Sequence, residues 1–351
     1  MNPKTLNYKM PAEWATHERT FLSWPVRESM CFPNDYERVC LGYAGFIEAI
    51  ADFEPVTVLV NPNEQNFVNT FVNQSRFQFE QFVLPHNDSW LRDNGPTFVQ
   101  DTQGNLAGIN WHFNAWGEKY QPWDLDDKVA HVLLDDLQVR RFDAPLVMEG
   151  GSFHVDGEGT LLTTEQCLLN ANRNPAMNRD QIEQSLQEYL NISKVIWLKN
   201  GLSGDETDGH VDNIACFAAP GKVLIQCCDD PEDDNYLITK ENIARLEKAV
   251  DAQGRRLEII RIPQPPARFY QGMRLTLSYL NFYFVNNGII LPVFGGNADK
   301  TDRQAASILA EMFPDRTIRT VDGMAIIREG GNVHCSTQQM PKTKEAGEVK
   351  L

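Results

Sequence analysis

The chain has 351 residues, of which 42% are hydrophobic and 23% charged, enough for one large closed α/β fold or for two domains. Its formal net charge of −16 argues against nucleic acid or an anionic membrane as a partner, whereas a cationic small molecule is compatible. The cysteines, at positions 31, 40, 167, 216, 227, 228 and 335, include no Cys-x-x-Cys pair, which disfavours a disulfide framework and a zinc ribbon. The sequence shows neither an apolar signal segment nor a run of the ~18 apolar residues that a membrane span needs, so we expect a cytoplasmic protein.

The N-terminal part predicts two helices and two strands. Apolar residues at helical spacing predict a helix over 35–53, and the run 56–60 predicts a buried strand. Asn61, Pro62 and Glu64 then form the typical start of a second helix, with a capping residue, a proline in the first turn and an acid three residues on. Residues 77–84 alternate as in a strand.

From Trp90 onward a single pattern recurs, in which acidic residues and glycine lead into a strand, a turn and a return strand. Steps such as Asp156-Gly157 and Asn287-Gly288 favour hairpin turns. The hairpins start near residues 95, 150, 213, 281 and 331. Between them we predict helices over 124–137, 178–190, 240–252 and 301–313, and single strands over 194–198 and 257–262.

Five similar ββαβ units predict a closed ring. We expect one catalytic domain over residues 1–351, an α/β propeller with five blades and pseudo-fivefold order, whose hairpin ends converge on a central active site. The alternative is an ordinary α/β protein that contains several hairpins.

Cys335 is the candidate nucleophile. It follows Gly330-Gly331 and a short run that favours extended structure, so we expect it at the end of a tight turn that a ligand can approach closely. A thiol attacks as the thiolate, which requires a proton acceptor or a positive field nearby. In an extended chain the adjacent His334 would point to the opposite face, so the partner should come from a distant segment. The alternative is a buried cysteine with a packing role only.

Other candidates lie at the starts of the hairpins. His210 and Asp212 are two residues apart, and in an extended segment they would share a face. Asp93 and Glu149 stand beside glycines at the first and second hairpins. Carboxylates gathered around one thiol require a positively charged, planar ligand, and a guanidinium matches them with its fork of N–H donors. Nothing nearby has metal-site spacing, so we expect no metal.

Several segments resemble those of agmatine deiminases, which belong to the guanidine-modifying superfamily beside the bacterial peptidylarginine deiminases. The superfamily has the pentein fold, a five-bladed α/β propeller. The resemblance runs in order from about residue 10 to 341. The segments are Met10–Trp14, Trp90–Pro96, Phe113–Gly117, Glu149–Ser152, Leu168–Pro175, Gly209–Asn213 and Gly330–Cys335.

The resemblance implies a role for each candidate. Cys335 would attack the guanidinium carbon, and His210 would protonate the departing ammonia and then deprotonate the hydrolytic water. Asp93 and Asp212 would clamp the guanidinium, and Glu149 would orient His210 or the substrate. The implied reaction converts agmatine to N-carbamoylputrescine and ammonia in polyamine metabolism, through a covalent thiouronium and with neither metal nor cofactor.

The tail of the substrate distinguishes agmatine deimination from the alternative functions. Agmatine ends in an ammonium, so we expect Trp90 and Trp116 to wall its aliphatic chain and Glu206 to lie near the amine, although Glu206 could instead belong to a solvated acidic loop. The rivals are deimination of arginine or peptidyl-arginine, amidinotransfer, and a non-catalytic polyamine-binding protein. A homo-oligomer is left open.

Overall fold

The computed structural model describes residues 1–29, 35–72 and 79–343, so that Cys31 and the first two residues of the strand predicted over 77–84 lie outside the described residues. The helices are α1 (Tyr36–Ala51), α2 (Gln65–Val68), α3 (Leu91–Asn94), α4 (Ala115–Glu118), α5 (Asp126–Asp136), α6 (Glu165–Leu168), α7 (Arg179–Leu190), α8 (Asn235–Lys248), α9 (Asp299–Met312) and α10 (Val333–Ser336). Short 3-10 turns span η1 (Lys4–Leu6), η2 (Gly150–Ser152), η3 (Val211–Asn213), η4 (Gly296–Ala298) and η5 (Ile327–Glu329).

The strands of the first half are β1 (His17–Ser23), β2 (Val56–Val60), β3 (Glu80–Val83), β4 (Thr97–Gln100), β5 (Leu106–His112), β6 (Arg140–Val147), β7 (Phe153–Val155), β8 (Thr160–Thr164) and β9 (Lys194–Leu198). Those of the second half are β10 (Ala215–Ala219), β11 (Lys222–Cys227), β12 (Glu258–Pro263), β13 (Phe269–Tyr270), β14 (Met273–Arg274), β15 (Tyr283–Val285), β16 (Gly288–Val293), β17 (Thr317–Asp322) and β18 (Thr337–Pro341).

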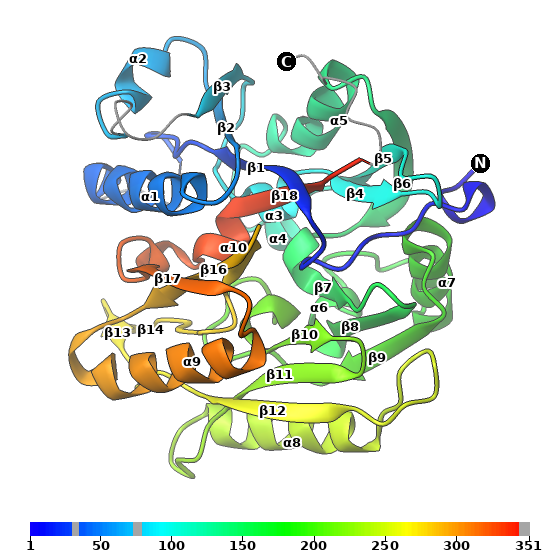
Figure 1. Ribbon diagram of the computed structural model, residues 1–351, viewed down its shortest axis with the longest axis vertical. Coiled ribbons are helices and arrows are strands. Elements are labelled where there is room, and N and C mark those ends of the chain that lie inside the picture. The colour runs from blue at the N-terminus through cyan, green and yellow to red at the C-terminus, as the bar shows by residue number, and fades with distance from the viewer. Residues whose placement is uncertain (30–34, 73–78, 344–351) are drawn as a thin grey trace.

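Four sheets share one plan, in which an antiparallel hairpin is followed by a helix and by a third strand parallel to the second. They are β4-β5-β6, β7-β8-β9, β10-β11-β12 and β15-β16-β17. Helices α5, α7, α8 and α9 make the four connections and lie, with α1, at the periphery, whereas α3, α4 and α10 lie near the centre (Figure 1). The predicted α/β propeller fold class is confirmed.

A fifth sheet closes the ring with both ends of the chain. Strand β18 pairs antiparallel with β1, with Gln339 opposite Thr20, and β1 runs parallel to β2 with Thr20 opposite Val56. The hairpin predicted near residue 331 is therefore wrong in its return strand, which comes from the N-terminus. Strand β1 lies between β18 and β2, and its Phe21 and Leu22 are fully buried there, so burial of these apolar side chains favours the pairing.

Two helices begin at other residues than predicted. In each case a polar side chain near the predicted or observed start makes a long-range contact. Asn61 does not cap a helix, since its side chain hydrogen-bonds both the N–H and the C=O of His86, and α2 is only four residues long. Helix α8 begins at Asn235 rather than at residue 240, because the Asn235 side chain accepts from the Ser203 N–H at 2.7 Å and donates to Gln264 at 2.8 Å. By contrast, α7 matches the helix predicted over 178–190, and it opens with a capping box formed by Asn178 and Gln181.

Apolar side chains fill the space between each sheet and its helices. Strands β2 and β8 are buried at every position, as expected for strands covered on both faces. Among the described residues, the helices are too short or too polar to cross a membrane. The hairpin starts turn inward, and they carry the polar residues that the sequence singled out.

Candidate active site

Cys335 lies on the one-turn helix α10, not in the extended run that the sequence predicted. Asn332 caps this turn by accepting from the Val333 N–H at 3.1 Å, and its own amide donates to the Gly323 carbonyl at 3.0 Å. Gly331 has to be small, because a Cβ atom there would lie 2.3 Å from the Trp90 ring and 3.0 Å from the Cβ of Cys335. Gly331 thus lets the chain pass between Trp90 and Cys335.

The Cys335 thiol is buried but reaches a pocket. Its Sγ lies 3.0 Å from Nδ2 of Asn281 and 3.4 Å from Oδ2 of Asp212, and the residue is 6% exposed. Burial, reinforced by the negative charges of Asp212 and Asp93, raises the pKa of this thiol well above its ordinary value. Without a ligand, Cys335 is therefore a neutral thiol at physiological pH.

His334 supports the same carboxylate that faces the thiol. Its Nδ1 lies 3.0 Å from Oδ2 of Asp212, and its Nε2 lies 3.0 Å from Oε2 of Glu13. Burial and nearby Arg92 oppose the charged imidazole, but Glu13 and Asp212 outweigh them and raise the pKa of His334. Burial would raise the pKa of Asp212, yet the hydrogen bond and charge of His334 hold it below its usual range. The prediction that His334 points away was wrong because α10 is helical, so adjacent residues do not alternate between faces.

Gly151 is the point at which the predicted residues meet. Its N–H donates to Oδ1 of Asp93 at 2.9 Å. A Cβ atom on Gly151 would lie 2.6 Å from Nδ1 of His210, 2.9 Å from Oδ2 of Asp212 and 3.0 Å from Oδ1 of Asp93. His210 and Asp212 thus reach one spot from the 3-10 turn η3 rather than from the extended segment that the sequence predicted.

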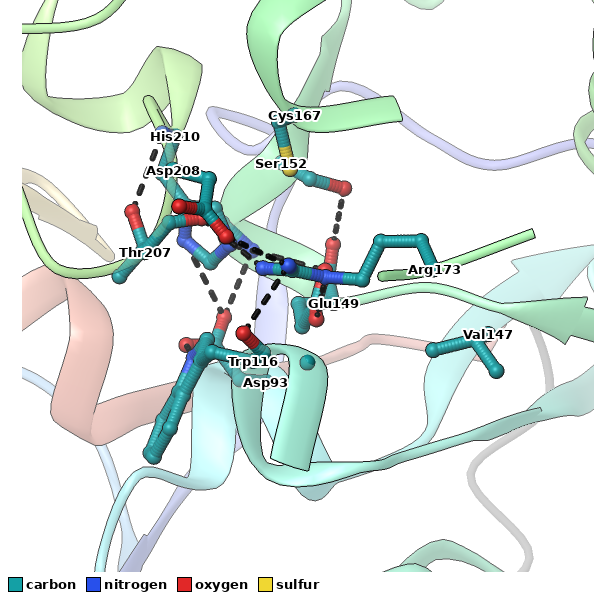
Figure 2. Close-up of polar contacts among 12 residues, drawn as sticks. Asp93, Trp116, Val147, Glu149, Ser152, Cys167, Arg173, Thr207, Asp208 and His210 are labelled. Carbon is teal, nitrogen blue, oxygen red and sulfur yellow. Dashed lines mark hydrogen bonds and ion pairs between the residues drawn. The ribbon is translucent and has the colours of Figure 1, made fainter. Parts of the chain in front are cut away.

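His210 is held between two carboxylates (Figure 2). Its Nδ1 lies 3.8 Å from Oδ1 of Asp93, and its Nε2 lies 3.7 Å from Oε2 of Glu149. Burial disfavours the charged imidazole, but the charge of Asp93, together with Cys167 and Glu149, raises the pKa of His210 well above its ordinary value. Burial likewise raises the pKa of Asp93, against the opposing charge of His210. The arrangement favours the protonated form of His210, which lies close to Asp93 and Asp212.

Arg173 is a site residue to which the sequence analysis gave no role. Its Nε donates to Oε1 of Glu149 at 2.6 Å, and its Nη1 donates to the Trp116 carbonyl at 3.0 Å and to Oδ2 of Asp208 at 2.8 Å (Figure 2). Its Nη2 donates to the Thr207 carbonyl at 2.9 Å. The buried guanidinium of Arg173 thus links Glu149 to the backbone of Trp116 and to the loop that contains Thr207 and Asp208. The only sequence signal was its position in the segment Leu168–Pro175.

Trp116 is positioned by a left-handed turn. In α4, the φ angles are 52° at Ala115, 56° at Trp116 and 63° at Glu118, which L-residues other than asparagine and aspartate rarely adopt. The Asn114 side chain closes the turn by accepting from the Gly117 N–H at 2.9 Å. The turn directs Nε1 of Trp116 to Oδ2 of Asp93, at 2.9 Å.

A pocket leads from the surface to Cys335. Cys335 and Asp93 lie at its base, Trp90 and Trp116 wall it, and Glu206 lies at its exposed end, where the Tyr120 hydroxyl donates to its Oε2. The predicted residues Glu149, His210 and Asp212 are buried and lie outside this lining. The complete lining consists of Trp90, Asp93, Trp116, Tyr120, Glu206, Thr207, Glu329, Gly330, Gly331 and Cys335.

The described part of the chain holds one group of side chains close enough together to bind a metal ion. Glu149, Cys167 and His210 offer ligand atoms that all lie within 4.8 Å of one another. However, Arg173 pairs with Oε1 of Glu149, and the raised pKa of His210 favours its protonated form. Both features oppose a cation at this position, so the chemistry of the donor set does not favour a metal.

Comparison with known proteins places this geometry in a family. The model of the Porphyromonas-type peptidyl-arginine deiminases matches residues 9–341. A protein provisionally named agmatine deiminase from Legionella pneumophila (strain Paris) is 45% identical over 346 residues, covering 99% of each chain. The solved agmatine deiminase of Enterococcus faecalis superposes with a TM-score of 0.89 at 36% identity, covering 97% of this chain and 98% of that one. A serine variant of the C. jejuni agmatine deiminase with substrate bound superposes with a TM-score of 0.87 at 32% identity, covering 96% and 97%.

Proposed function

The chain belongs to the Porphyromonas-type peptidyl-arginine deiminase family, and we propose that it hydrolyses agmatine to N-carbamoylputrescine and ammonia. One observation carries the proposal: a single pocket with aromatic walls has a cysteine and an aspartate at its base and a glutamate at its outer end. Agmatine has the matching shape, with a guanidinium at one end, an ammonium at the other and an aliphatic chain between them. Relatives named agmatine deiminase support the assignment.

The carboxylates at and behind the base of the pocket suit a guanidinium. Oδ1 of Asp212 is buried and has no hydrogen-bond partner among residues 1–29, 35–72 and 79–343. An N–H fork placed between Asp212 and Asp93 would satisfy this atom and would neutralise the two carboxylates that face Cys335. Because those carboxylates help to raise the pKa of the thiol, a bound cation would lower that pKa and favour the thiolate.

The reaction follows from these positions. The Cys335 thiolate attacks the guanidinium carbon to form a tetrahedral adduct, and the C–N bond to one terminal nitrogen then breaks. His210 gives its proton to this nitrogen, so ammonia leaves and a thiouronium remains on the sulfur. His210, now neutral, takes a proton from water as the water oxygen attacks the same carbon. The C–S bond then breaks while the hydroxyl proton of the adduct passes to water, which releases the neutral ureido product and restores the thiolate.

Glu149, Arg173 and Asp93 position the reacting groups. Glu149 lies 3.7 Å from Nε2 of His210, so its charge stabilises the imidazolium before ammonia departs. Arg173 holds Glu149 in this orientation. Asp93 is fixed by the Gly151 N–H and by the Trp116 indole, which leaves it facing the pocket base.

The lining also bears on arginine and peptidyl-arginine as alternative substrates. Free arginine has a carboxylate beside its amine, and a site for it needs a cationic group. The described residues that line the pocket include no lysine or arginine, and the outer end presents Glu206. This charge pattern favours a tail with an ammonium and without a carboxylate.

A product assay tests the proposal. The protein is incubated separately with agmatine, arginine and an arginyl peptide, and ammonia and product masses are measured. We expect ammonia only with agmatine, together with a product in which one NH has been exchanged for O. Equal or faster release from arginine or the peptide would overturn the assignment of agmatine, and transfer of the amidino group to an added amine would overturn hydrolysis.

A further inference from the structure

Besides Asp93 and Glu206, the pocket is lined by a third carboxylate, that of Glu329. Glu329 ends the turn η5, immediately before Gly330 and Gly331, and it lines the same pocket as Glu206 and Cys335. Its side chain is 12% exposed, so the carboxylate is largely shielded from solvent yet borders the cavity. Neither its position in the chain nor the family resemblance drew attention to it.

Of the two oxygens of the Glu329 carboxylate, Oε1 accepts a hydrogen bond from the protein. Nη2 of Arg38 donates to Oε1 of Glu329 at 3.1 Å. In the part of the chain that the structure describes, no donor is hydrogen-bonded to Oε2. Arg38 is also shared with Asp35, whose Oδ2 accepts from its Nε at 2.5 Å, and with the carbonyls of Met324 and Ala325. Glu329 therefore retains an oxygen that can accept from a ligand.

We propose that Glu329 is a specificity-determining residue that, together with Glu206, binds the cationic tail of the substrate. The inference rests on the proposed function, because it concerns the tail of the molecule whose guanidinium end reaches Cys335. Glu206 comes from the loop before His210, and Glu329 comes from the turn before Cys335. A terminal ammonium has three donors, so it can be shared by two carboxylates, whereas an uncharged tail gains nothing from either.

The surroundings of Glu329 make its charge responsive to such a cation. Burial raises the pKa of Glu329 to about 7, against the opposing charge of Arg38. The charged and titratable groups that act on it or share its pocket are Arg38, Asp35, Asp88, Glu206, Asp93, Tyr120 and Cys335. Most of these groups are acidic and oppose ionisation of Glu329. The positive charge of an ammonium beside Glu329 would counter them and favour its ionised form. Binding of the tail should therefore strengthen as the pH rises through about 7.

The test compares two substrates that differ only in the tail. Agmatine carries the terminal ammonium, and n-butylguanidine has the same chain length and ends in a methyl group. For Glu329→Gln we expect KM for agmatine to rise by roughly fivefold to tenfold, and KM for n-butylguanidine to change by less than about twofold. The matched control is Asp35→Asn, which removes a negative charge beside Arg38 without altering the pocket lining; it should leave both KM values near those of the wild type.

Each outcome separates the tail-binding role from the alternatives. If Glu329→Gln raises both KM values alike, or if Asp35→Asn reproduces its effect, Glu329 is only a structural partner of Arg38 and the inference is overturned. In the wild type, the ratio of the two KM values should favour agmatine increasingly between about pH 6 and pH 8. A ratio independent of pH would overturn the inference even if the variant does not fold. Ammonia release from neither substrate by the wild type would instead refute the proposed function itself.

Discussion

At the scale of single residues, the site depends on space as much as on charge. His210, Asp212 and Asp93 approach one another because Gly151 has no side chain. The sequence predicted the acids and the histidine because their residue types and positions at hairpin starts were informative. It could not identify Gly151 as the residue that lets them approach, because that depends on the side chains packed around it in the fold.

Replacing Gly151 with alanine should disrupt this convergence. The added Cβ would lie 2.6 Å from Nδ1 of His210, and the nearby atoms belong to side chains that can shift without unfolding the protein. We expect kcat for agmatine to fall by about a hundredfold or more, because reacting groups tolerate little displacement. Steady-state kinetics and circular dichroism measure the two effects, and a folded variant with wild-type kcat would contradict the packing argument.

The charge state of Cys335 gives a prediction about pH. Burial, with Asp212 and Asp93, raises the pKa of the thiol well above its ordinary value of 9.0. Because only the thiolate is alkylated, iodoacetamide should modify Cys335 in the free enzyme far more slowly at pH 8 than in the urea-unfolded chain, and the rate should still be rising at pH 9. Mass spectrometry of the Cys335 peptide follows the reaction. A rate that reaches its plateau below pH 8 would show that the thiol is already ionised without a ligand.

Three supporting residues escaped the sequence analysis for a common reason. His334, Asn281 and Arg173 act through partners that lie far away in the chain. His334 was also misjudged because the extended conformation expected around Cys335 places neighbours on opposite faces. Residue types alone do not indicate such contacts, which exist only once the ring has formed.

At the scale of elements, the spacing of apolar residues and the turn-forming residue pairs predicted the long helices and the hairpins. They did not predict the one-turn helices. The helix predicted over 178–190 and the strand predicted over 194–198 match α7 and β9. By contrast, α10 and η3 are too short to show a helical period, and both carry site residues. The local conformation was therefore mispredicted where the chemistry is concentrated.

Two glycines of α1 provide a matched test of how this helix packs. Gly45 is exposed, and a Cβ atom there would meet nothing within 4 Å, whereas a Cβ on Gly42 would lie 2.7 Å from the Cβ of Ala325. We expect Gly45→Ala to stabilise the protein by about 0.5–1 kcal/mol, through helix propensity. Gly42→Ala should destabilise it by about 1–3 kcal/mol, through overpacking. Urea unfolding measures both, and equal effects would mean that α1 does not lie against residues 325 and 326.

At the scale of the whole molecule, the N-terminal segment completes both the ring and the site. Strand β1 supplies the return strand for β18, and the preceding Glu13 contacts His334, which supports Asp212. The sequence analysis detected five units because four hairpins are continuous in the chain. It assigned the fifth hairpin to the C-terminus alone, because pairing between the two ends leaves no local signal.

Glu13→Gln tests this closure. Glu13 is 3% exposed, and its carboxylate lies close to His334, His154 and Arg92. His334 and the other neighbours, acting against burial, hold the pKa of Glu13 well below 4.5, so the carboxylate stabilises the fold above that pH and ceases to do so as the pH falls through its folded-state value. The pKa of His334 is raised above 6.5, so its charge stabilises the fold most fully below that pH.

At pH 6, where both groups are charged, Glu13→Gln should therefore lower the free energy of unfolding by about 3 kcal/mol. Glu18→Gln, on β1 itself, is the control and should change it by less than about 0.5 kcal/mol. Chemical denaturation measures both variants. A loss no larger than that of the control would mean that Glu13 does not anchor the N-terminal segment to the site.

In the proposed reaction, the sulfur of Cys335 near the C-terminus and the imidazole of His210 in the middle of the chain act on one cation, and ammonia release from agmatine measures their joint action. We predict that Cys335→Ala and His210→Ala, each folded by circular dichroism, release ammonia at least about a thousandfold more slowly than the wild type. Cys227→Ala, a half-buried cysteine outside the pocket lining, should match the wild type. Turnover near the wild-type rate in either site variant, or its loss in Cys227→Ala, would contradict the account.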